Sequence, residues 1–259
     1  MTKNILLTND DGIYAEGLWA LYKRFTPRHA VTVVAPDRER SAVGHGITLY
    51  QPLRKTKIYV SDGLWGYAVS GTPVDCIKMG LIKILDKRPD LVISGINLGA
   101  NVGININYSG TVAAAREAAI YKVPAIAVSV KGNELMDYDE AASFIAQLAE
   151  NVFKNGLPFG TILNVNIPDM PMEEIAGIRI NRQAIEEYTE YLEKRVDPRN
   201  RTYYWHGHVP QTSFDNPDFD AVALDKNYIS ITPIKCDMTD YSLLEELKGW
   251  EIGKKKTQA

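Results

Sequence analysis

The stretch that decides the fold is Asn4-Ile5-Leu6-Leu7-Thr8-Asn9-Asp10-Asp11-Gly12, an apolar run followed at once by polar residues and a glycine. A continuous apolar run predicts a strand buried on both faces, here residues 4–8. Residues 16–24 then carry apolar side chains at helical spacing, and residues 31–35 form a second apolar run that ends before Pro36. A strand, a helix and a strand in this order predict the first βαβ unit of a parallel sheet.

The same alternation continues downstream. Further strands are predicted at residues 65–70, 91–94, 124–130 and 161–167, and further helices at residues 73–85, 111–121 and 138–154. Residues 47–60 are expected to form an extended ribbon. The sequence therefore predicts an α/β fold, a doubly wound and mostly parallel sheet covered by helices on both faces, with a core that ends near residue 180.

Beyond residue 180 the pattern changes. Strands are predicted at residues 178–184, 201–209 and 228–234, and they are separated by a charged stretch and a loop rich in Pro, Asp and Asn instead of helices. Aromatic residues gather in the same region: Tyr188, Tyr191, Tyr203, Tyr204 and Trp205. We therefore divide the chain into a core, residues 1–180, and a β-rich C-terminal arm, residues 181–259, suited to contact another subunit.

Composition and charge restrict the class of protein. The chain has 259 residues, 45% hydrophobic and 24% charged, which is close to globular averages. Its net charge of −3 argues against a protein built to bind nucleic-acid duplexes, which would carry a basic surplus. No apolar run approaches the roughly 18 residues of a membrane span, and two distant cysteines give neither a disulfide scaffold nor a zinc finger. We expect a cytoplasmic protein without a membrane partner.

Polar side chains follow three predicted strands, where ligands of an open parallel sheet bind. The loops after these strands contain Asn9-Asp10-Asp11-Gly12, then Ser41 and His45, then Asn97 and Asn101. Carboxylate, hydroxyl and carboxamide oxygens are hard ligands that suit Mg²⁺ or Mn²⁺. Adjacent acids point to opposite faces of a straight strand, but a turn at Gly12 would let both face one cation. An ordinary Asp-Asp-Gly turn is the alternative.

The loops lack the motifs of other phosphate chemistries. A haloacid-dehalogenase-type phosphatase needs an aspartate two positions before Asp11, where Asn9 stands. Gly95, Gly99 and Gly103 are spaced by four, so they do not form a dinucleotide fingerprint, and no P-loop is present. A backbone cradle or a flexible surface loop remain the two interpretations of the glycine-rich stretch.

Ser109, Gly110 and Thr111 precede or begin the predicted Ala-rich helix. Hydroxyls and free N–H groups at a helix N-terminus form an anion site, which predicts phosphate binding here. Capping of the helix by Ser or Thr is the alternative, and the two roles are compatible. His45, which lies between two glycines, is a weaker candidate for substrate contact. Asn9 and Gly12, which flank the two acids, are assigned to the same substrate-binding group.

Five motifs occur in one order along the chain. They are Ile-Leu-Leu-Thr-Asn-Asp-Asp-Gly-Ile from residue 5, Val-Val-Ala-Pro-Asp-Arg-Glu-Arg-Ser-Ala at 33–42, Ser-Gly-Thr-Pro-Val-Asp-Cys at 70–76, Pro-Asp-Leu-Val-Ile-Ser-Gly-Ile-Asn-Leu-Gly-Ala-Asn at 89–101, and Tyr-Ser-Gly-Thr-Val-Ala-Ala-Ala-Arg-Glu-Ala at 108–118. Together they resemble the survival-protein SurE family of 5′-nucleotidases. The resemblance covers nearly the whole chain and is weakest in the C-terminal arm.

This resemblance implies a metal-dependent phosphomonoester hydrolase acting on nucleoside 5′-monophosphates, with activity on 3′-nucleotides or polyphosphate as an extension. It implies a Rossmann-like core and a C-terminal arm exchanged between subunits of a dimer or tetramer. The implied ligands of one Mg²⁺ or Mn²⁺ are Asp10, Asp11, Ser41 and Asn97, with the two aspartates catalytic, and the implied phosphate contacts are Asn101, Ser109, Gly110 and Thr111. A nucleotide-binding regulator without turnover is the competing hypothesis, whereas the glycine spacing disfavours a nicotinamide dehydrogenase.

Overall fold

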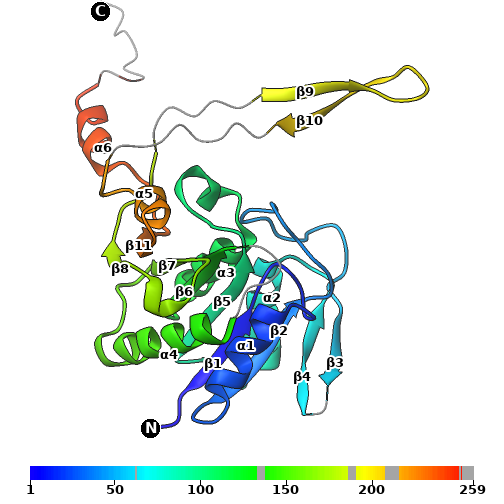
Figure 1. The fold of residues 1–259 in the computed structure, drawn as a ribbon, viewed down its shortest axis with the longest axis vertical. Coiled ribbons are helices and arrows are strands. Elements are labelled where there is room, and N and C mark those ends of the chain that lie inside the picture. Colours follow the sequence, from blue (N-terminus) through cyan, green and yellow to red (C-terminus); the bar gives the residue numbers. More distant parts are fainter. Residues whose placement is uncertain (62, 133–137, 186–190, 208–215, 251, 253–259) are drawn as a thin grey trace, which may run out of the picture.

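The structure is a computed structural model that describes residues 1–61, 63–132, 138–185, 191–207, 216–250 and 252 (Figure 1). One large sheet contains the strands β1 (Asn4–Thr8), β2 (Ala30–Pro36), β3 (Lys55–Ser61), β4 (Leu64–Val69), β5 (Leu91–Leu98), β6 (Ala125–Lys131), β7 (Thr161–Pro168), β8 (Gly177–Ile180) and β11 (Tyr228–Lys235). The α-helices are α1 (Glu16–Phe25), α2 (Pro73–Met79), α3 (Gly110–Ile120), α4 (Tyr138–Asn155), α5 (Asp220–Asp225) and α6 (Tyr241–Leu247). The predicted α/β class is confirmed.

The nine strands follow the order β3-β4-β2-β1-β5-β6-β7-β11-β8. The neighbours from β4 to β7 are parallel, whereas β3 and β11 run antiparallel to β4 and β7. After β1 the chain first adds strands on one side, and it later returns to place β5 on the other side. The strand order therefore reverses between β1 and β5, and in an open α/β sheet that reversal marks the crevice where ligands bind.

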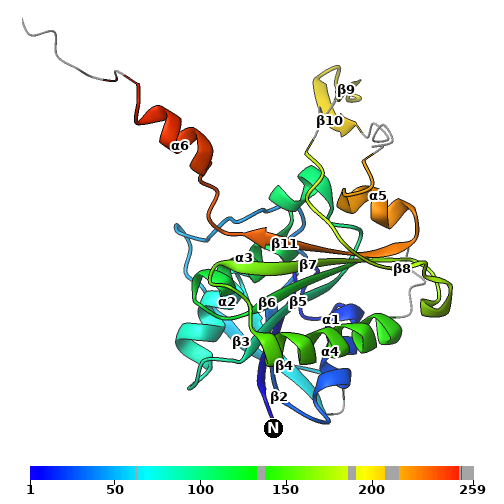
Figure 2. The same cartoon turned by 90° about the vertical axis from the view of Figure 1, so that its left-hand side faces the viewer.

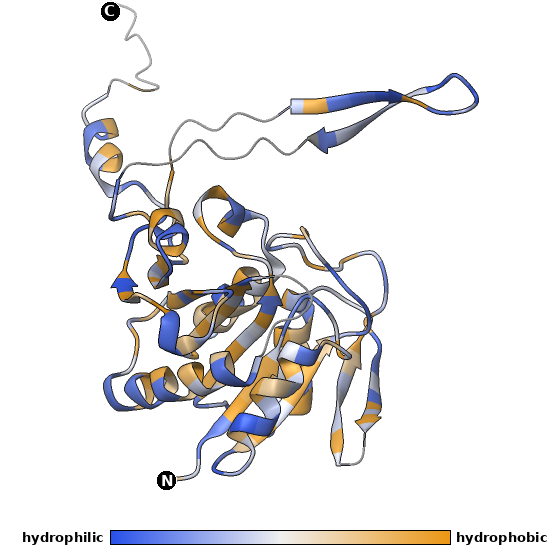
Figure 3. Ribbon diagram, in the orientation of Figure 1, coloured by the Kyte–Doolittle hydropathy of each residue, from blue (hydrophilic) through white to orange (hydrophobic). Residues whose placement is uncertain are grey.

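The apolar run of β1 explains the two-faced core. Ile5 and Leu7 pack with side chains of α1 and α4, whereas Leu6 packs with α2 and α3 on the opposite face. Side chains alternate along a strand, so a strand that is apolar throughout requires helices on both faces. Figure 3 shows apolar residues along the central strands and the helices beside them.

Several predicted elements have different bounds in the structure. The strand predicted over 91–94 continues to Leu98 in β5, and the strand predicted over 178–184 already ends at Ile180 in β8. The helix predicted over 73–85 consists of α2, opened by a capping box of Thr72 and Asp75, and a π-helix, Gly80–Ile84. The ribbon predicted over 47–60 is a strand only in β3. Its first part is held instead by bonds such as that from the Thr48 N–H to the Asp75 carboxylate, at 3.1 Å to Oδ2.

The chain beyond residue 180 is divided between the sheet and two projecting parts. Strand β11 pairs with β7 and β8, so residues on both sides of the predicted boundary share one sheet. Strands β9 (Tyr191–Val196) and β10 (Thr202–Gly207) form an antiparallel hairpin that projects from the body, and α6 projects separately (Figures 1 and 2). Four parts of the predicted arm, residues 186–190 with Tyr188, 208–215, 251 and 253–259, lie outside the described residues.

Two short 3₁₀-helices complete the structure, η2 (Gly103–Asn107) and η3 (Met172–Glu174). The first leads from the end of β5 to the start of α3, and it therefore joins two of the loops selected from the sequence. Within the described residues, no helix is both long and apolar enough to cross a bilayer.

Candidate active site

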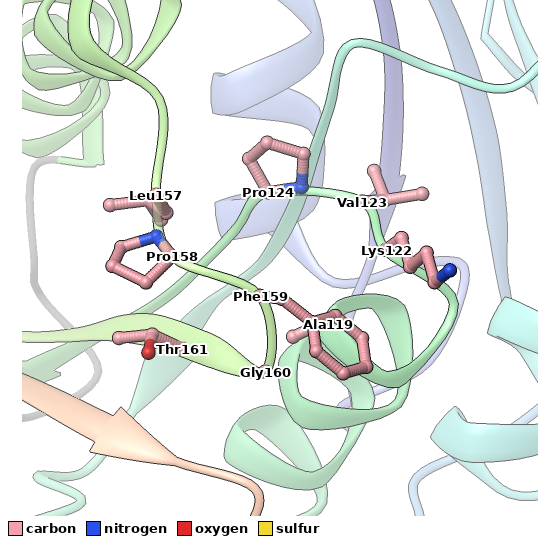
Figure 4. Close-up of a pocket in the computed structure, with 9 residues that line it drawn as sticks. All are labelled: Ala119, Lys122, Val123, Pro124, Leu157, Pro158, Phe159, Gly160 and Thr161. Atoms are coloured by element: carbon pink, nitrogen blue, oxygen red, sulfur yellow. The ribbon is translucent and has the colours of Figure 1, made fainter.

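Two depressions of about 440 Å³ each lie at opposite ends of the parallel strands. The first lies where the chain enters β6 and β7, between the segments Lys122–Pro124 and Leu157–Thr161 (Figure 4). Its lining residues are mostly apolar and include no carboxylate, histidine or cysteine. The second lies beyond the carboxyl ends of β1 and β5, where the strand order reverses, and it is the candidate active site.

The second depression brings together most of the polar residues selected from the sequence. Its lining residues are Asp10, Asp11, Glu39, Ser41, Ala42, Asn97, Leu98, Ala100, Asn101, Asn105, Tyr108 and Ser109. Three are acids, and none is Lys, Arg or His. An anionic substrate would be repelled by such a surface unless a cation lay between them.

The loop after β1 is held by its own first residue. The Asn9 amide donates to the Gly12 carbonyl at 3.0 Å, and the Gly12 N–H donates to Asn9 Oδ1 at 3.1 Å. Gly12 has a φ of +99°, and a Cβ there would lie 3.0 Å from the Arg38 carbonyl carbon. Only glycine suits this position. Asn9 is fully buried, so Asn9 and Gly12 shape the turn that presents the two acids.

Asp10 lies against the beginning of α3. The Thr111 hydroxyl donates to Asp10 Oδ1 at 2.5 Å, and Thr111 is fully buried. A Cβ on Gly110 would lie 2.8 Å from the Asp10 Cβ, so the glycine allows this close approach. Asp10 is therefore the anion that the start of α3 stabilises in this structure. A direct phosphate contact by Thr111 stays a prediction, and it would require the hydroxyl to leave Asp10.

The two acids are held at an electrostatic cost. Burial raises the pKa of Asp10, although the hydroxyl and the N–H of Thr111 oppose the rise. Burial also raises the pKa of Asp11 to about 7, and the charges of Asp10 and Glu39 add to the rise. A divalent cation would reverse both effects by favouring the ionised carboxylates.

The loop after β2 supplies Ser41 and an acid that the sequence had not singled out. The Ser41 hydroxyl donates to Glu39 Oε1 at 2.6 Å, and both residues line the depression. The Arg40 N–H donates to the Asp10 carbonyl at 2.7 Å and joins this loop to the first one. The clue to Glu39 was its place in the same strand-end loop as Ser41.

Asn97 lines the depression from the last part of β5, where the strand is irregular. The pairing of β5 with β6 shifts between Ser94 and Asn97. The Asn97 amide nitrogen donates to the Gly99 carbonyl at 2.6 Å. The nitrogen is therefore used by the loop, and the carbonyl oxygen is the atom that a cation could use.

Asn101 is fixed by polar residues that sequence reasoning missed. Its N–H donates to Asn166 Oδ1 at 2.8 Å, and its carbonyl accepts from the amides of Asn164 and Asn166 at 2.8 and 3.1 Å. Its own amide donates to Ser129 Oγ at 2.8 Å. Asn164 and Asn166 are buried polar residues in the otherwise apolar β7, and that break in the pattern was the available clue.

Ser109 caps α3, because its side chain accepts from the Val112 N–H at 3.1 Å. Ser109 also lines the depression, which agrees with the expectation that capping and anion binding are compatible.

His45 does not line the depression. Its Nε2 lies 2.8 Å from Glu117 Oε2, and Lys78 Nζ lies 2.9 Å from the other oxygen of the buried Glu117. Burial opposes ionisation of Glu117, but these two partners hold its pKa below the usual value. In this structure His45 anchors the segment that follows Ser41, and its contact with substrate stays a prediction.

The donor set fits a hard divalent cation. It consists of two carboxylates with a hydroxyl and a carboxamide, all oxygen donors of the type that Mg²⁺ and Mn²⁺ bind. Among the residues that the structure describes, no three His, Cys, Asp or Glu side chains converge as a metal cluster. A cation here would therefore depend on the neutral oxygens of Ser41 and Asn97.

Comparisons with known proteins show which family this chain resembles. Residues 5–190 match the model of the family described as survival protein SurE. A protein of Desulfatibacillum aliphaticivorans named 5′-nucleotidase SurE is 53% identical over 97% of this chain and 99% of its own length. Another of that name, from Syntrophobacter fumaroxidans, is 44% identical over 96% of this chain and 99% of its own length. The crystal structure of a SurE protein from Aquifex aeolicus superposes with a TM-score of 0.81 at 39% identity, covering 95% of this chain and 98% of that one.

Proposed function

This chain belongs to the SurE family, and from that membership and the acidic depression we propose that it is a 5′-nucleotidase, which releases phosphate from nucleoside 5′-monophosphates with a divalent cation. The name that the full-length relatives carry supports the activity. The acidic lining of the depression supports the metal dependence.

The observation that carries the proposal is the pair of adjacent acids in a depression without a basic lining residue. A site for a phosphate group needs positive charge, and enzymes obtain it from Arg, Lys or a metal ion. Because the lining supplies acids instead, a cation is required to join the site to its substrate.

We assign the ligands of that cation to Asp10, Asp11, Ser41 and Asn97. When bound, a divalent cation neutralises phosphate charge and acidifies water, the nucleophile of a metal-assisted hydrolysis. Thr111 holds one oxygen of Asp10, so Asp10 is the more firmly oriented acid. An oxygen of either aspartate that the cation leaves free could orient the attacking water or take its proton.

Phosphate contacts are assigned to the loop after β5 and to the start of α3, beside Asp10. Asn101 is rigidly held in that loop, so its side chain meets a substrate with little loss of entropy. Ser109 and Gly110 begin α3, whose positive end favours the equatorial oxygens of phosphate. Asp10, Asp11 and Ser41 thus come from other loops than the phosphate contacts, whereas Asn97 and Asn101 lie on one segment at the end of β5.

The test is phosphate release from AMP with Mn²⁺ and with EDTA. Wild type should turn over only with the cation. Asp10→Asn and Asp11→Asn should each lower kcat by at least about 10²-fold while circular dichroism remains that of wild type. Full activity of both variants would refute the metal assignment, and nucleotide binding without turnover would favour a regulator. Assays with 3′-AMP and tripolyphosphate test the extension to 3′-nucleotides and polyphosphate.

The projecting hairpin supports an oligomer. Its strands expose large apolar side chains, among them Tyr191, Leu192, Tyr204 and Trp205, each at least half exposed. Exposed apolar groups of this size gain most by burial against another subunit. We propose that the C-terminal arm, residues 181–259, joins subunits into a homodimer or homotetramer, with residues 1–180 as the catalytic core even though β11 returns to its sheet.

A further inference from the structure

A distant part of the chain holds the peptide groups of Gly103, just beyond Asn101. The Gly103 N–H donates to Asp220 Oδ2 at 3.0 Å. The Gly103 carbonyl accepts from the Gln183 amide at 2.8 Å. Gln183 precedes the hairpin β9–β10 in the chain and Asp220 follows it, and both contact one residue of the active-site loop.

Asp220 is a fully buried carboxylate at the centre of this contact. Its second oxygen accepts from the N–H groups of Ala184 and Ala221 at 3.0 and 2.9 Å. One side chain therefore ties together three separate segments of the chain. Burial raises the pKa of Asp220, while the N–H groups of Gly103, Ala184 and Ala221 oppose that rise.

Apolar packing surrounds the contact. Val102 packs in a small buried cluster with residues of α5 and with Ala184 and Phe219, and Ala100 packs against it. This cluster is separate from the two clusters that cover the faces of the sheet. Its packing therefore stabilises the active-site loop at Val102 more directly than it stabilises the sheet.

The loop that is gripped carries one side of the proposed site. Asn101 and Asn105 line the depression on either side of Gly103, and η2 ends at Asn107, directly before Tyr108 and Ser109. Asp10, Asp11 and Ser41 lie in other loops, and Asn97 lies within β5. The two bonds to Gly103 thus act directly on the segment assigned to phosphate, and neither reaches a proposed cation ligand.

We propose that Gln183 and Asp220 are positioning residues, which hold the segment from Asn101 to Ser109 in its phosphate-binding geometry. The proposal rests on the proposed function of the depression. Neither residue lines the depression, so both act through the Gly103 peptide.

The variants are Gln183→Ala, which removes one hydrogen bond, and Asp220→Asn, which conserves the shape of the side chain. The matched control is Asp225→Asn. Asp225 lies on the same helix, α5, and its carboxylate pairs with Lys131 at 2.5 Å on the surface instead of with Gly103. A general effect of disturbing α5 would appear in the control as well.

Three measurements on the full chain decide the matter. Hydrogen–deuterium exchange of residues 98–108 should quicken in both test variants and stay as in wild type in the control. The affinity for inorganic phosphate in the presence of Mn²⁺ should fall about 10-fold, and 1/KM for AMP should fall by the same factor. A change of this size corresponds to the loss of one hydrogen bond to a charged group, here the phosphate. Mn²⁺ affinity, measured by calorimetry without nucleotide, should change less than 2-fold, roughly the scatter of unperturbed sites.

The proposal is overturned if exchange in 98–108 does not change, or if it quickens while phosphate binding and KM match the control. Equal losses of Mn²⁺ and phosphate affinity would also overturn it, because they indicate general damage to the site. If Asp220→Asn does not fold, Gln183→Ala alone decides. A wild type that does not hydrolyse AMP would refute the proposed function, and phosphate binding with the exchange data would still decide the role of the two residues.

Discussion

Replacing Asp11 by Asn is predicted to stabilise the metal-free protein above neutral pH. The pKa of this carboxyl is raised from its ordinary 3.8 to about 7, because burial, Asp10 and Glu39 all disfavour its charge. A raised pKa means that the fold prefers the protonated acid. The stabilising contribution is therefore complete below about pH 4, and it is lost as pH rises through about 7. Asn remains neutral and avoids that loss.

The magnitude follows from the size of the shift. About three pKa units at about 1.36 kcal/mol each give an upper bound of about 4 kcal/mol. Asp11 is partly exposed, and screening by solvent reduces the value to about 2 kcal/mol. That amount is a substantial share of the net stability of a typical domain.

Urea unfolding in EDTA at pH 4 and pH 8 measures the effect. At pH 8 Asp11→Asn should exceed wild type by about 2 kcal/mol, and at pH 4 the two should be equal within about 0.5 kcal/mol. Asp86→Asn is the control, since Asp86 is an exposed acid outside the depression and should give no such gap. Saturating Mn²⁺ at 100 times its Kd should stabilise wild type by about 2.7 kcal/mol and the variant by less. A variant that is no more stable than wild type at pH 8 would refute the electrostatic argument.

Three further predictions concern packing and assembly. Gly110→Ala should push Asp10 aside, since the new Cβ would lie 2.8 Å from the Asp10 Cβ; we expect Mn²⁺ affinity to fall and urea unfolding to show a loss of about 1–3 kcal/mol. Thr111→Val should weaken Mn²⁺ binding by about 10-fold through loss of the bond to Asp10, whereas Thr111→Ser should retain it; calorimetry that shows weaker phosphate binding with unchanged Mn²⁺ affinity would assign the hydroxyl to phosphate instead. Replacing residues 191–207 by a short Gly-Ser linker should lower the mass seen by light scattering, and a full-length protein that is already monomeric at micromolar concentration would contradict the assigned role of the arm.

The order of the elements was predictable because its causes are local. The apolar residues Ile5, Leu6 and Leu7 require cover on both faces, and helical spacing in the segments between strands supplies it. Element ends depend on more distant partners. β5 continues to Leu98 because its last residues pair with Ser129 and Val130, and nothing near residue 98 in the sequence indicates that pairing.

The C-terminal strands illustrate the same limit. β9 lies in a stretch interpreted as charged, and it is a strand because it pairs with β10, where Glu193 lies opposite Trp205. β11 was predicted as a strand, but its place beside β7 was not, since a strand pattern does not identify its neighbour.

The sequence could predict that four candidate site residues lie together at the C-terminal ends of the parallel strands. Asp10, Asp11, Ser41 and Asn97 share a depression because parallel strands end at one edge of the sheet. Which group each side chain contacts was not predictable. The bond from Thr111 to Asp10 and that from Gly103 to Asp220 join residues about a hundred positions apart.

The three buried or half-buried acids with raised pKa values differ in how the fold treats them. Asp220 accepts hydrogen bonds from three N–H groups and does not line the depression, so its carboxylate is compensated inside the protein. Asp10 has the hydroxyl and N–H of Thr111 as partners and still faces the depression. For Asp11, burial and the negative charges of Asp10 and Glu39 raise the pKa, and no hydrogen bond from the described residues contributes to lowering it. An acid with a raised pKa that the fold leaves uncompensated in a cleft is a candidate for binding a cation, whereas hydrogen bonds inside the protein indicate a structural role. By this criterion we propose that Asp11 is the primary ligand of a cation, that Asp10 is a ligand oriented by α3, and that Asp220 supports the loop.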